Sequence, residues 1–288
     1  MNVKKTCYIQ LNKRDIRRLL PPRRRESHKG DYGKILLLCG SRGCTGAAKL
    51  AARAACRSGA GLVYLGVPAS VYPIIAAQLD EPLVFPLPDT EDGSFSAAAA
   101  ERIKSWIART DVVLFGPGCA NTAHTRQLVQ MLLQEVKGPL ILDADGINAL
   151  QGHIDLLQAR SGTTILTPHD GEFLRIYDGP PQDRCQETRA LARKLGCIVL
   201  RKGYRTLITD GVRVYRNRTG NPGMAKGGSG DALSGILCAL LGQKLAPLEA
   251  AALAAYLHGA AGDAAAKEKG EWSMLPSDLI EALPAVMR

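Results

Sequence analysis

The chain of 288 residues is 46% hydrophobic and 22% charged, a composition that supports a folded core and excludes an intrinsically disordered protein. Its formal net charge is +10, but residues 1–34 hold eleven Lys and Arg against three Asp and Glu, which leaves +2 for the rest. The body is therefore not expected to bind nucleic acid. Residues 1–34 are predicted to form a basic extension with an amphipathic helix at DIRRLL, although such an arm can also bind polyanions.

Two further absences limit the class of protein. No apolar run approaches the roughly 18 residues of a membrane span, and the N-terminal segment lacks the apolar core of a signal peptide. The eight cysteines form no C-x-x-C pair and mostly lie among apolar or small residues, which favours reduced, buried thiols. We therefore expect a cytoplasmic protein that does not associate with membranes.

The order of elements predicts the fold class. Short β-branched or leucine-rich runs alternate with alanine-rich segments of helical period, which is typical of an α/β domain with a largely parallel sheet. Strands are expected at 34–40, 61–68, 82–88, 111–118, 139–145, 163–168 and 197–203. Helices are expected at 45–59, 71–79, 97–109 and 187–196, and one between the strands at 139–145 and 163–168.

The C-terminal third changes pattern. Two alternating runs around Asp-Gly at 205–217 predict an antiparallel hairpin. Helices are then expected at 231–241, at 248–267 and from 276 to the end. Because no break in composition follows residue 34, residues 1–288 are predicted to form one domain, with the basic extension packed on it or flanking it.

Glycine-rich or polar motifs follow five of the predicted strands. They are GSRGCTGA at 40–47, GPG at 116–118, DADGIN at 143–148, TPHDGE at 167–172 and RKGYRT at 201–206. Each motif alone is weak, since Gly-Pro-Gly is usually a turn and a lone His169 in a loop is more often structural. Ligands of open α/β sheets collect beyond the carboxyl ends of the strands, so the shared position favours a common site.

The stretch GNPGMAKGGSGD at 220–231 is the sharpest motif. A glycine-rich loop that leads into a helix lets backbone N–H groups converge on an anion. The stretch is neither a Walker A sequence nor G-x-G-x-x-G with its acidic ribose ligand. Asp231 at the helix start can accept a proton from a hydroxyl group while nearby amides hold a phosphoryl group. The alternative is an unliganded helix start capped by Ser229 or Asp231.

These motifs carry a resemblance to a known superfamily. GGSGD resembles the G-[ST]-G-D signature of ribokinase-like proteins, in which the aspartate is the catalytic base. TPHDGE has the spacing of their N-x-x-E element, with His169 in place of Asn and Glu172 as the acidic member that helps to organise magnesium and phosphate. The resemblance implies a three-layer α/β domain with helices on both faces of the sheet.

Taken together, the motifs look like those of the ADP/ATP-dependent NAD(P)H-hydrate dehydratases. SHKGDYGK, GSRGCTGA, GPG, LDADGIN, TPHDGE, KGYRT and GNPGMAKGGSGD occur in the family's order, over about residues 10–285. Lys226, Ser229 and Ala232 are mild departures from the Thr, Thr and Val associated with the family. No epimerase domain precedes the match, so the chain resembles the stand-alone form of the enzyme.

The resemblance implies a repair reaction on the 6-hydroxy hydrates of NADH and NADPH, NADHX and NADPHX. The hydroxyl group is phosphorylated and lost as phosphate, with ADP the more probable donor and ATP the other. Asp231 would be the catalytic base and would contact the hydrate. The family's other roles map onto a larger set of positions. They are Ala47, Gly118 and His169 for the hydrate; Lys202, Gly203, Tyr204, Arg205, Thr206 and Gly230 for the nucleotide; and Gly228, Ser229 and Gly230 for the anion hole.

Mg²⁺ is expected as cofactor, with Glu172 near it directly or through water. The resemblance also implies assembly as a homotetramer or a larger oligomer. Asp143 and Asp145 are read either as groups that orient water around magnesium or as turn caps, and Lys202 either as a phosphate cation or as a solvated lysine. Two other functions stay open at this point. They are a ribokinase-like kinase of a small vitamin-precursor alcohol, and a catalytically idle nucleotide-binding module whose basic arm recruits a polyanion.

Overall fold

The computed structural model describes residues 8–288, and its centre is one nine-stranded sheet in the order β3-β2-β1-β4-β5-β6-β7-β8-β9. The strands from β3 to β7 run parallel, whereas β7, β8 and β9 pair antiparallel. The bounds are β1 Lys34–Leu38, β2 Leu62–Pro68, β3 Leu83–Leu87, β4 Val112–Phe115, β5 Leu140–Leu142, β6 Thr164–Leu166, β7 Ile198–Arg201, β8 Leu207–Thr209 and β9 Val214–Arg216. This confirms the largely parallel sheet and the hairpin.

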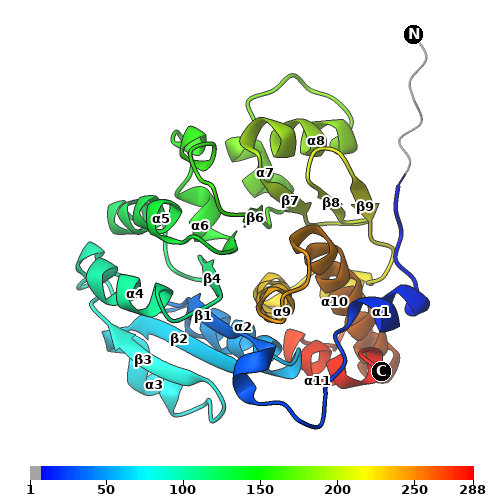
Figure 1. Ribbon diagram of the computed structural model, residues 1–288, viewed down its shortest axis with the longest axis horizontal. Helices are drawn as coiled ribbons and strands as arrows, with labels where there is room; N and C mark the ends of the chain where they lie inside the picture. Colours follow the sequence, from blue (N-terminus) through cyan, green and yellow to red (C-terminus); the bar gives the residue numbers. More distant parts are fainter. Residues whose placement is uncertain (1–7) are drawn as a thin grey trace.

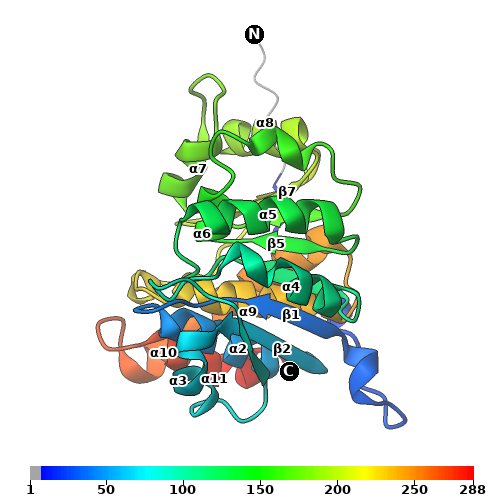
Figure 2. The same cartoon turned by 90° about the vertical axis from the view of Figure 1, so that its left-hand side faces the viewer.

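Helices cover both faces of the sheet (Figures 1 and 2). One side carries α1 Lys13–Leu19, α2 Thr45–Arg57, α3 Tyr72–Ala76, α9 Ser229–Gly242, α10 Pro247–Lys269 and α11 Pro276–Val286. The other carries α4 Ala100–Ile107, α5 Ala123–Glu135, α6 Asp145–Asn148, α7 Asp170–Ile176 and α8 Arg184–Leu195. The domain therefore has the three layers that the resemblance implied.

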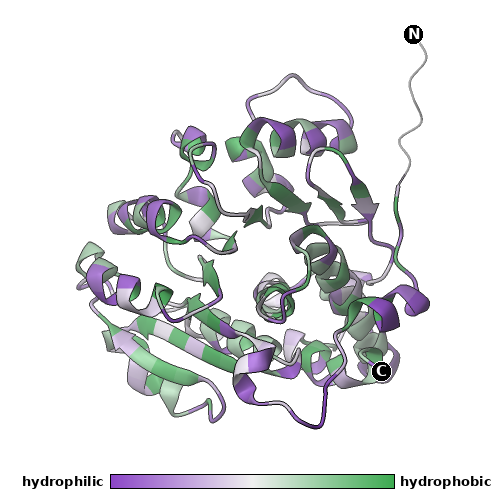
Figure 3. Cartoon of the chain, viewed as in Figure 1, coloured by the Kyte–Doolittle hydropathy of each residue, from purple (hydrophilic) through white to green (hydrophobic). Residues whose placement is uncertain are grey.

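The alternation of side chains along the strands explains the two faces. In β1, Ile35 and Leu37 belong to the core under α2 and α9, while Leu36 and Leu38 belong to the core under α4 and α5. Successive residues of a strand point to opposite faces, so an unbroken apolar run requires cover on both sides. Figure 3 shows these strands as mainly hydrophobic and the outer faces of the flanking helices as largely hydrophilic.

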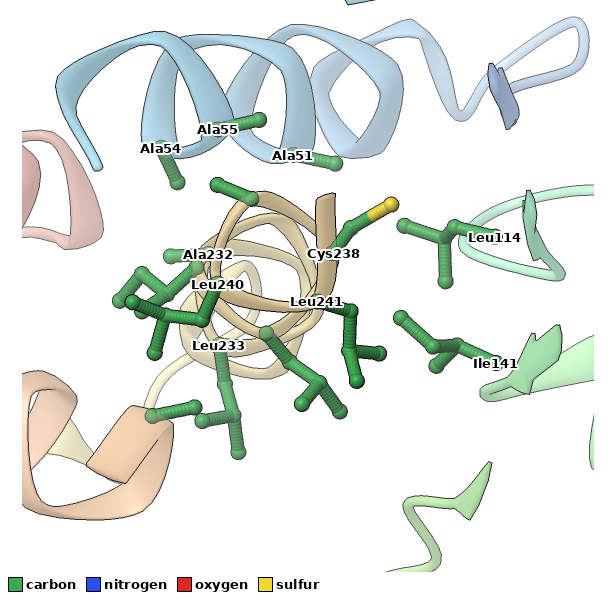
Figure 4. Packing of buried hydrophobic residues seen from close by; sticks show 14 of the residues in the cluster. Ala51, Ala54, Ala55, Leu114, Ile141, Ala232, Leu233, Cys238, Leu240 and Leu241 are labelled. Atoms are coloured by element: carbon green, nitrogen blue, oxygen red, sulfur yellow. The ribbon is translucent and has the colours of Figure 1, made fainter. Parts of the chain in front are cut away.

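Helix α9 is the buried helix of the fold. Every residue from Ala232 to Gly242 is buried. Figure 4 shows this helix between alanines of α2 and the strand residues Leu114 and Ile141. A Cβ atom on Gly235 would lie 2.1 Å from the backbone oxygen of Ala51, so the close approach of α2 requires glycine there. The helix whose start carries Asp231 is thus fixed by the interior of the protein.

Two helices of the structure were not predicted, α5 and the short α7. The helix expected between β5 and β6 is present as the short α6, and a 3-10 turn at Ile154–Leu157 follows it. Gly152, with φ of 77°, lies between these two pieces. The other predicted elements are present with shifted ends.

The described part of the basic extension packs against the body. Ile16 of α1 is only 3% exposed and belongs to the core under α10. Ile9 forms a parallel bridge with Tyr215 of β9, in which its amide donates to the Val214 carbonyl and its carbonyl accepts from the Arg216 amide, at 2.9 Å each. Within residues 8–288, no helix is both long enough and apolar enough to cross a membrane. Cys7 and the first residues of the arm lie outside the described part of the chain.

The cysteines of the described chain are free thiols. Five of them, Cys39, Cys119, Cys185, Cys197 and Cys238, are buried. Burial raises the pKa of the Cys197 thiol to about 12, so this group stays protonated at neutral pH. Cys44 is exposed at the start of α2 and Cys56 is partly exposed, so burial was predicted correctly for most of the set but not for all of it.

Candidate active site

The start of α9 is an uncapped helix N-terminus. Gly228 is the N-cap residue, with φ of 98°, and within residues 8–288 no side chain accepts a capping hydrogen bond from the amides of the first turn. The Ser229 hydroxyl donates instead to the carbonyl of Met224, 2.7 Å away. A helix leaves its first amides without intrahelical partners, so the N–H groups of Gly230 and Asp231 are free to bind an anion. The alternative of a helix capped by Ser229 or Asp231 is therefore wrong.

Bonds from the C-terminal part of the chain hold the glycine-rich loop in place. Asp263 of α10 accepts from the Gly220 amide at 2.9 Å and from the Asn221 side chain at 3.1 Å. Lys226 donates to the carbonyls of Trp272 and Met274, at 2.8 and 2.6 Å. The lysine that departs from the family pattern thus fastens the loop to the turn after α10.

Asp231 lies in the first turn of α9 beside charges from two neighbouring loops. Burial, and after it the charge of Asp143, raise the pKa of its carboxyl group, the charge of Lys202 lowers it, and the resulting pKa is about 6. A carboxyl group with a pKa near 6 is mostly ionised at neutral pH, so it is free to accept a proton. Its pKa also lies near the working pH, where a general base is most efficient. The environment of Asp231 therefore suits proton abstraction.

Lys202 and Asp143 form a buried ion pair next to that aspartate. The ammonium of Lys202, after β7, lies 2.7 Å from Asp143 Oδ1, after β5, and 3.8 Å from Glu172 Oε2. Burial lowers the pKa of Lys202, but the charges of Asp143 and Glu172 outweigh it and the pKa is raised. A Cβ atom on Gly230 would lie 3.3 Å from the lysine Nζ, so this cation stands beside the free amides. The reading of Lys202 as a solvated lysine is wrong.

The predicted residues of the hydrate site form two separate contacts. Gly118, with φ of 66°, lies so near α2 that a Cβ atom there would be 3.0 Å from the Cβ of Ala47. His169 instead forms a reciprocal capping box with Glu172 at the start of α7. Its Nδ1 accepts from the Glu172 amide at 3.2 Å, and Glu172 Oε2 accepts from the His169 amide at 2.8 Å. Its contact with a hydrate stays a prediction.

The two aspartates after β5 have different partners. Asp143 is 1% exposed, and besides Lys202 it accepts from the Ser234 hydroxyl at 2.7 Å and from the Ala144 amide at 2.9 Å. Asp145 accepts from the Ala120 amide at 2.9 Å, which ties the loop after β4 to the loop after β5. Asp145 thus joins two loops, which differs from the local turn cap that was considered, whereas Asp143 is the anionic centre of the cluster.

The predicted nucleotide loop follows Lys202. Gly203 and Arg205 have φ of 141° and 55°, and the Thr206 hydroxyl donates to the Gly203 carbonyl at 2.9 Å. Tyr204 is 85% exposed at the tip. Arg184 of α8 donates to the Lys202 carbonyl at 2.7 Å, and this bond joins the loop to α8. No motif predicted a role for Arg184, because only the packing of α8 brings it to this loop.

Two other residues of the site, Ser234 and His258, were also not predicted from the sequence. Ser234 follows Asp231 by one helical turn, a spacing that would have placed it on the same face of α9. His258 of α10 has its ring Nε2 2.9 Å from the carbonyl oxygen of Ser229. Burial lowers the pKa of His258 to about 4, so its ring is neutral at physiological pH. Its position in an alanine-rich helix gave no functional signal.

The carboxylates of the site suit a metal ion that is held mainly by the phosphates of a bound nucleotide. Within the described residues, no group of three His, Cys, Asp or Glu side chains is arranged to hold a metal. Glu172 is committed to the capping box and Asp143 to Lys202 and Ser234. Mg²⁺ commonly retains several waters and binds through substrate phosphates plus one or two carboxylates. The site therefore fits an ion that arrives with the nucleotide and meets Glu172 through water.

The layered sheet, with a glycine-rich loop and an aspartate at the start of a buried helix, defines a ribokinase-like α/β domain. Phosphofructokinase-2 of Escherichia coli has the same fold, with a TM-score of 0.60 at 12% identity over 89% of this chain and all of that one. This likeness concerns the fold alone.

Residues 35–285 match the model of the NAD(P)H-hydrate dehydratase family, and the chain belongs to this family. An ADP-dependent (S)-NAD(P)H-hydrate dehydratase of Cenarchaeum symbiosum is 36% identical over 95% of both chains. A crystal structure of the ADP/ATP-dependent NAD(P)H-hydrate dehydratase of Bacillus subtilis, co-crystallised with ATP and Mg²⁺, superposes with a TM-score of 0.84 at 32% identity, covering 99% of this chain and 98% of that one.

Bifunctional relatives are also similar. The bifunctional NAD(P)H-hydrate repair enzyme of Moorella thermoacetica is 44% identical over 93% of this chain and 52% of its own length. The chain thus spans about half the length of these bifunctional relatives.

Proposed function

We propose that the protein catalyses the nucleotide-dependent dehydration of NADHX and NADPHX to NADH and NADPH. One observation carries the proposal: the first turn of α9 holds both free amides and the buried Asp231. The chain that has this turn belongs to the dehydratase family. An anion site and a base at one point are what phosphoryl transfer to a hydroxyl group requires.

The proposed reaction has two stages. In the first stage, Asp231 accepts the proton of the 6-hydroxyl group, and the oxygen of that hydroxyl group attacks the terminal phosphorus of the nucleotide. The amides at the start of α9 hold the phosphoryl group during the transfer. The C–O bond of the phosphate ester then breaks, assisted by the ring nitrogen lone pair, and loss of a proton from C5 restores the C5=C6 bond. With ADP as donor, the products are NAD(P)H, AMP and phosphate.

The other groups of the site prepare the transfer. Lys202, next to Gly230, adds positive charge where the phosphoryl group is held, and Asp143 with Ser234 fixes the position of that ammonium group. Mg²⁺ bound with the nucleotide would neutralise phosphate charge, and Glu172 would orient one of its waters. Ala47 and Gly118 would admit the hydrate closely because neither has a bulky side chain.

The donor, the assembly and the location are also parts of this proposal. ADP is the proposed donor, supported by the dependence of the Cenarchaeum symbiosum relative. The homotetramer and the cytoplasmic location rest on the family resemblance and on the mainly buried free thiols. Light scattering should give four times the chain mass, and a dimer or monomer would refute the tetramer.

The deciding experiment follows the absorbance of reduced nicotinamide. Purified protein with Mg²⁺ and NADHX should restore this absorbance with ADP and more slowly with ATP, with one phosphate released per NADH formed. No recovery with either nucleotide would refute the dehydratase. The kinase of a vitamin-precursor alcohol is not favoured by the family match, and it would require a stable phosphorylated product instead.

A further inference from the structure

His258 reaches the anion site from a different helix. It lies in α10, and its Nε2 is 2.9 Å from the carbonyl oxygen of Ser229, the first residue of α9. A carbonyl oxygen can only accept a hydrogen bond, so Nε2 carries the proton and donates it. The low pKa of the buried ring keeps the other nitrogen unprotonated, which fixes this tautomer.

The planarity of the peptide bond connects this contact to the free amides. The carbonyl of Ser229 and the N–H of Gly230 belong to the same peptide unit, and no peptide bond of the described chain is cis. In a trans peptide the two groups lie in one plane and point in opposite directions. A hydrogen bond that holds the carbonyl on the side of α10 therefore holds the amide pointing away from α10, toward the site.

The surrounding sequence gives an added restraint on this peptide plane something to act on. Gly228 and Gly230 flank Ser229, and glycine restricts backbone rotation less than any other residue. The Ser229 hydroxyl bonds to the Met224 carbonyl, which restrains the side chain. The peptide plane that follows lies in the first turn of α9, where the helical pattern also directs the Leu233 amide to the Ser229 carbonyl. Among the described side chains, only His258 donates to the carbonyl of this plane.

We propose that His258 is a positioning residue of the anion hole, which acts through the Ser229 carbonyl to fix the direction of the Gly230 N–H group. The inference rests on the proposed function, because it takes the Gly230 amide to be a donor to the transferring phosphoryl group. It assigns to α10 a part in catalysis although His258 itself does not touch the nucleotide.

The test compares two substitutions at this position. His258→Leu removes the donor, and His258→Gln keeps an N–H donor on a flexible side chain. A misdirected hole donor should lower kcat by about 10-fold to 100-fold, whereas the KM for NADHX should stay within about 2-fold. Gln should recover most of the lost kcat. The matched control is His124→Leu, because the Nδ1 of His124 also bonds to a backbone group, the Ala97 amide at 3.3 Å, and belongs to no part of the site.

A second readout is independent of turnover. In protein labelled with ¹⁵N-glycine, His258→Leu should shift the amide signal of Gly230 and speed its hydrogen exchange, and adding ADP with Mg²⁺ should shift that signal less than in the wild type. His124→Leu should leave the signal unchanged. An unaltered Gly230 signal with wild-type kcat in His258→Leu would overturn the inference, and so would an equal loss of kcat in His124→Leu.

Failure of the proposed function looks different. If wild-type protein does not dehydrate NADHX with either nucleotide, the dehydratase is refuted. The Gly230 signal and its response to ADP then still decide whether His258 directs this amide.

Discussion

The ammonium of Lys202 lies 2.7 Å from a carboxylate oxygen of Asp143, although the two residues follow strands that are separated by β6 in the sheet. The pair is nearly out of contact with water, since the side chains are 17% and 1% exposed. Two buried charges of opposite sign stabilise each other, and loss of one leaves the other without a partner. The pair also adjusts Asp231, because its two charges move the pKa of that aspartate in opposite directions.

Lys202→Met should therefore destabilise the fold as well as the activity. It leaves Asp143 buried with only the Ser234 hydroxyl and the Ala144 amide, and the expected loss in the free energy of unfolding is about 3 to 5 kcal/mol. Urea denaturation measures it. Lys194→Met is the matched control, because Lys194 forms an ion pair of the same length with Asp178 on the surface, where solvent screens the charges and only a small loss is expected. Equal losses would contradict the role given to burial.

Asp231→Asn should abolish most of the turnover and leave ADP binding nearly intact. Loss of a general base lowers rates by about 10²-fold to 10⁴-fold. Kinetics with NADHX and calorimetric titration with ADP separate the two effects. Asp210→Asn is the control, because Asp210 accepts from the amides of Val212 and Arg213 in the β8–β9 turn, a role that Asn can fill. Wild-type turnover in Asp231→Asn would indicate the idle nucleotide-binding module.

The raised pKa of Asp231 predicts how activity varies with pH. The base must be ionised to accept the hydroxyl proton, so kcat/KM should rise with pH and level off above the pKa of about 6. Rates measured with one substrate concentration series at each pH between 5 and 8 test this. A profile that is flat across that range would exclude Asp231 as the titrating base.

The raised pKa of Asp231 also predicts that ionisation of this group lowers the free energy of unfolding. An acid whose pKa is raised on folding binds more protons in the native state between the unfolded pKa of 3.8 and about 6, so stability is lost as the pH rises through this window. Asp231→Asn removes that loss and should stabilise the protein at pH 8 by at most about 3 kcal/mol. The gain should shrink toward pH 4. Thermal unfolding at several pH values measures it, and a stabilisation independent of pH would contradict the linkage.

Gly228→Ala should disrupt the start of α9. The residue has φ of 98°, and an added Cβ atom would lie 2.5 Å from Leu50 Cδ1. The left-handed backbone alone costs about 1 to 2 kcal/mol for alanine. Gly43→Ala is the control, since φ is 84° there but no atom lies within 4 Å of the new Cβ. The excess loss of stability in Gly228→Ala over Gly43→Ala measures the contact with α2, and no excess would exclude it.

The parts of the fold that follow from local pattern were predictable. Apolar runs such as KILLL and VVLF marked strands buried on both faces, and the loops after them met at one edge because parallel strands end together. The helix α5 was missed, although Thr122 caps it and Leu128, Val129, Leu132 and Leu133 line its buried face. Polar residues between these apolar ones obscured the period.

The site was predictable only where a motif carried it. Asp231, Lys202 and Gly230 come together as their motifs indicated. The contacts of Arg184 and His258 depend on how α8 and α10 pack, and periodicity gives no information about which partner a helix meets. The capping box of His169 and Glu172 lay in the spacing of TPHDGE, where a polar residue precedes Glu by three positions, but the resemblance directed attention to ligands instead.

The fastening of the glycine-rich loop has a consequence for how the protein matures during synthesis. Asp263, Trp272 and Met274 follow the loop residues that they hold, Gly220, Asn221 and Lys226, by 42 to 48 positions in the chain. A ribosome that has completed the sheet and α9 has not yet supplied these anchors. The loop at the start of α9 can therefore be secured only after α10 and the turn that follows it have been made, and nucleotide binding should be among the last properties that the growing chain acquires.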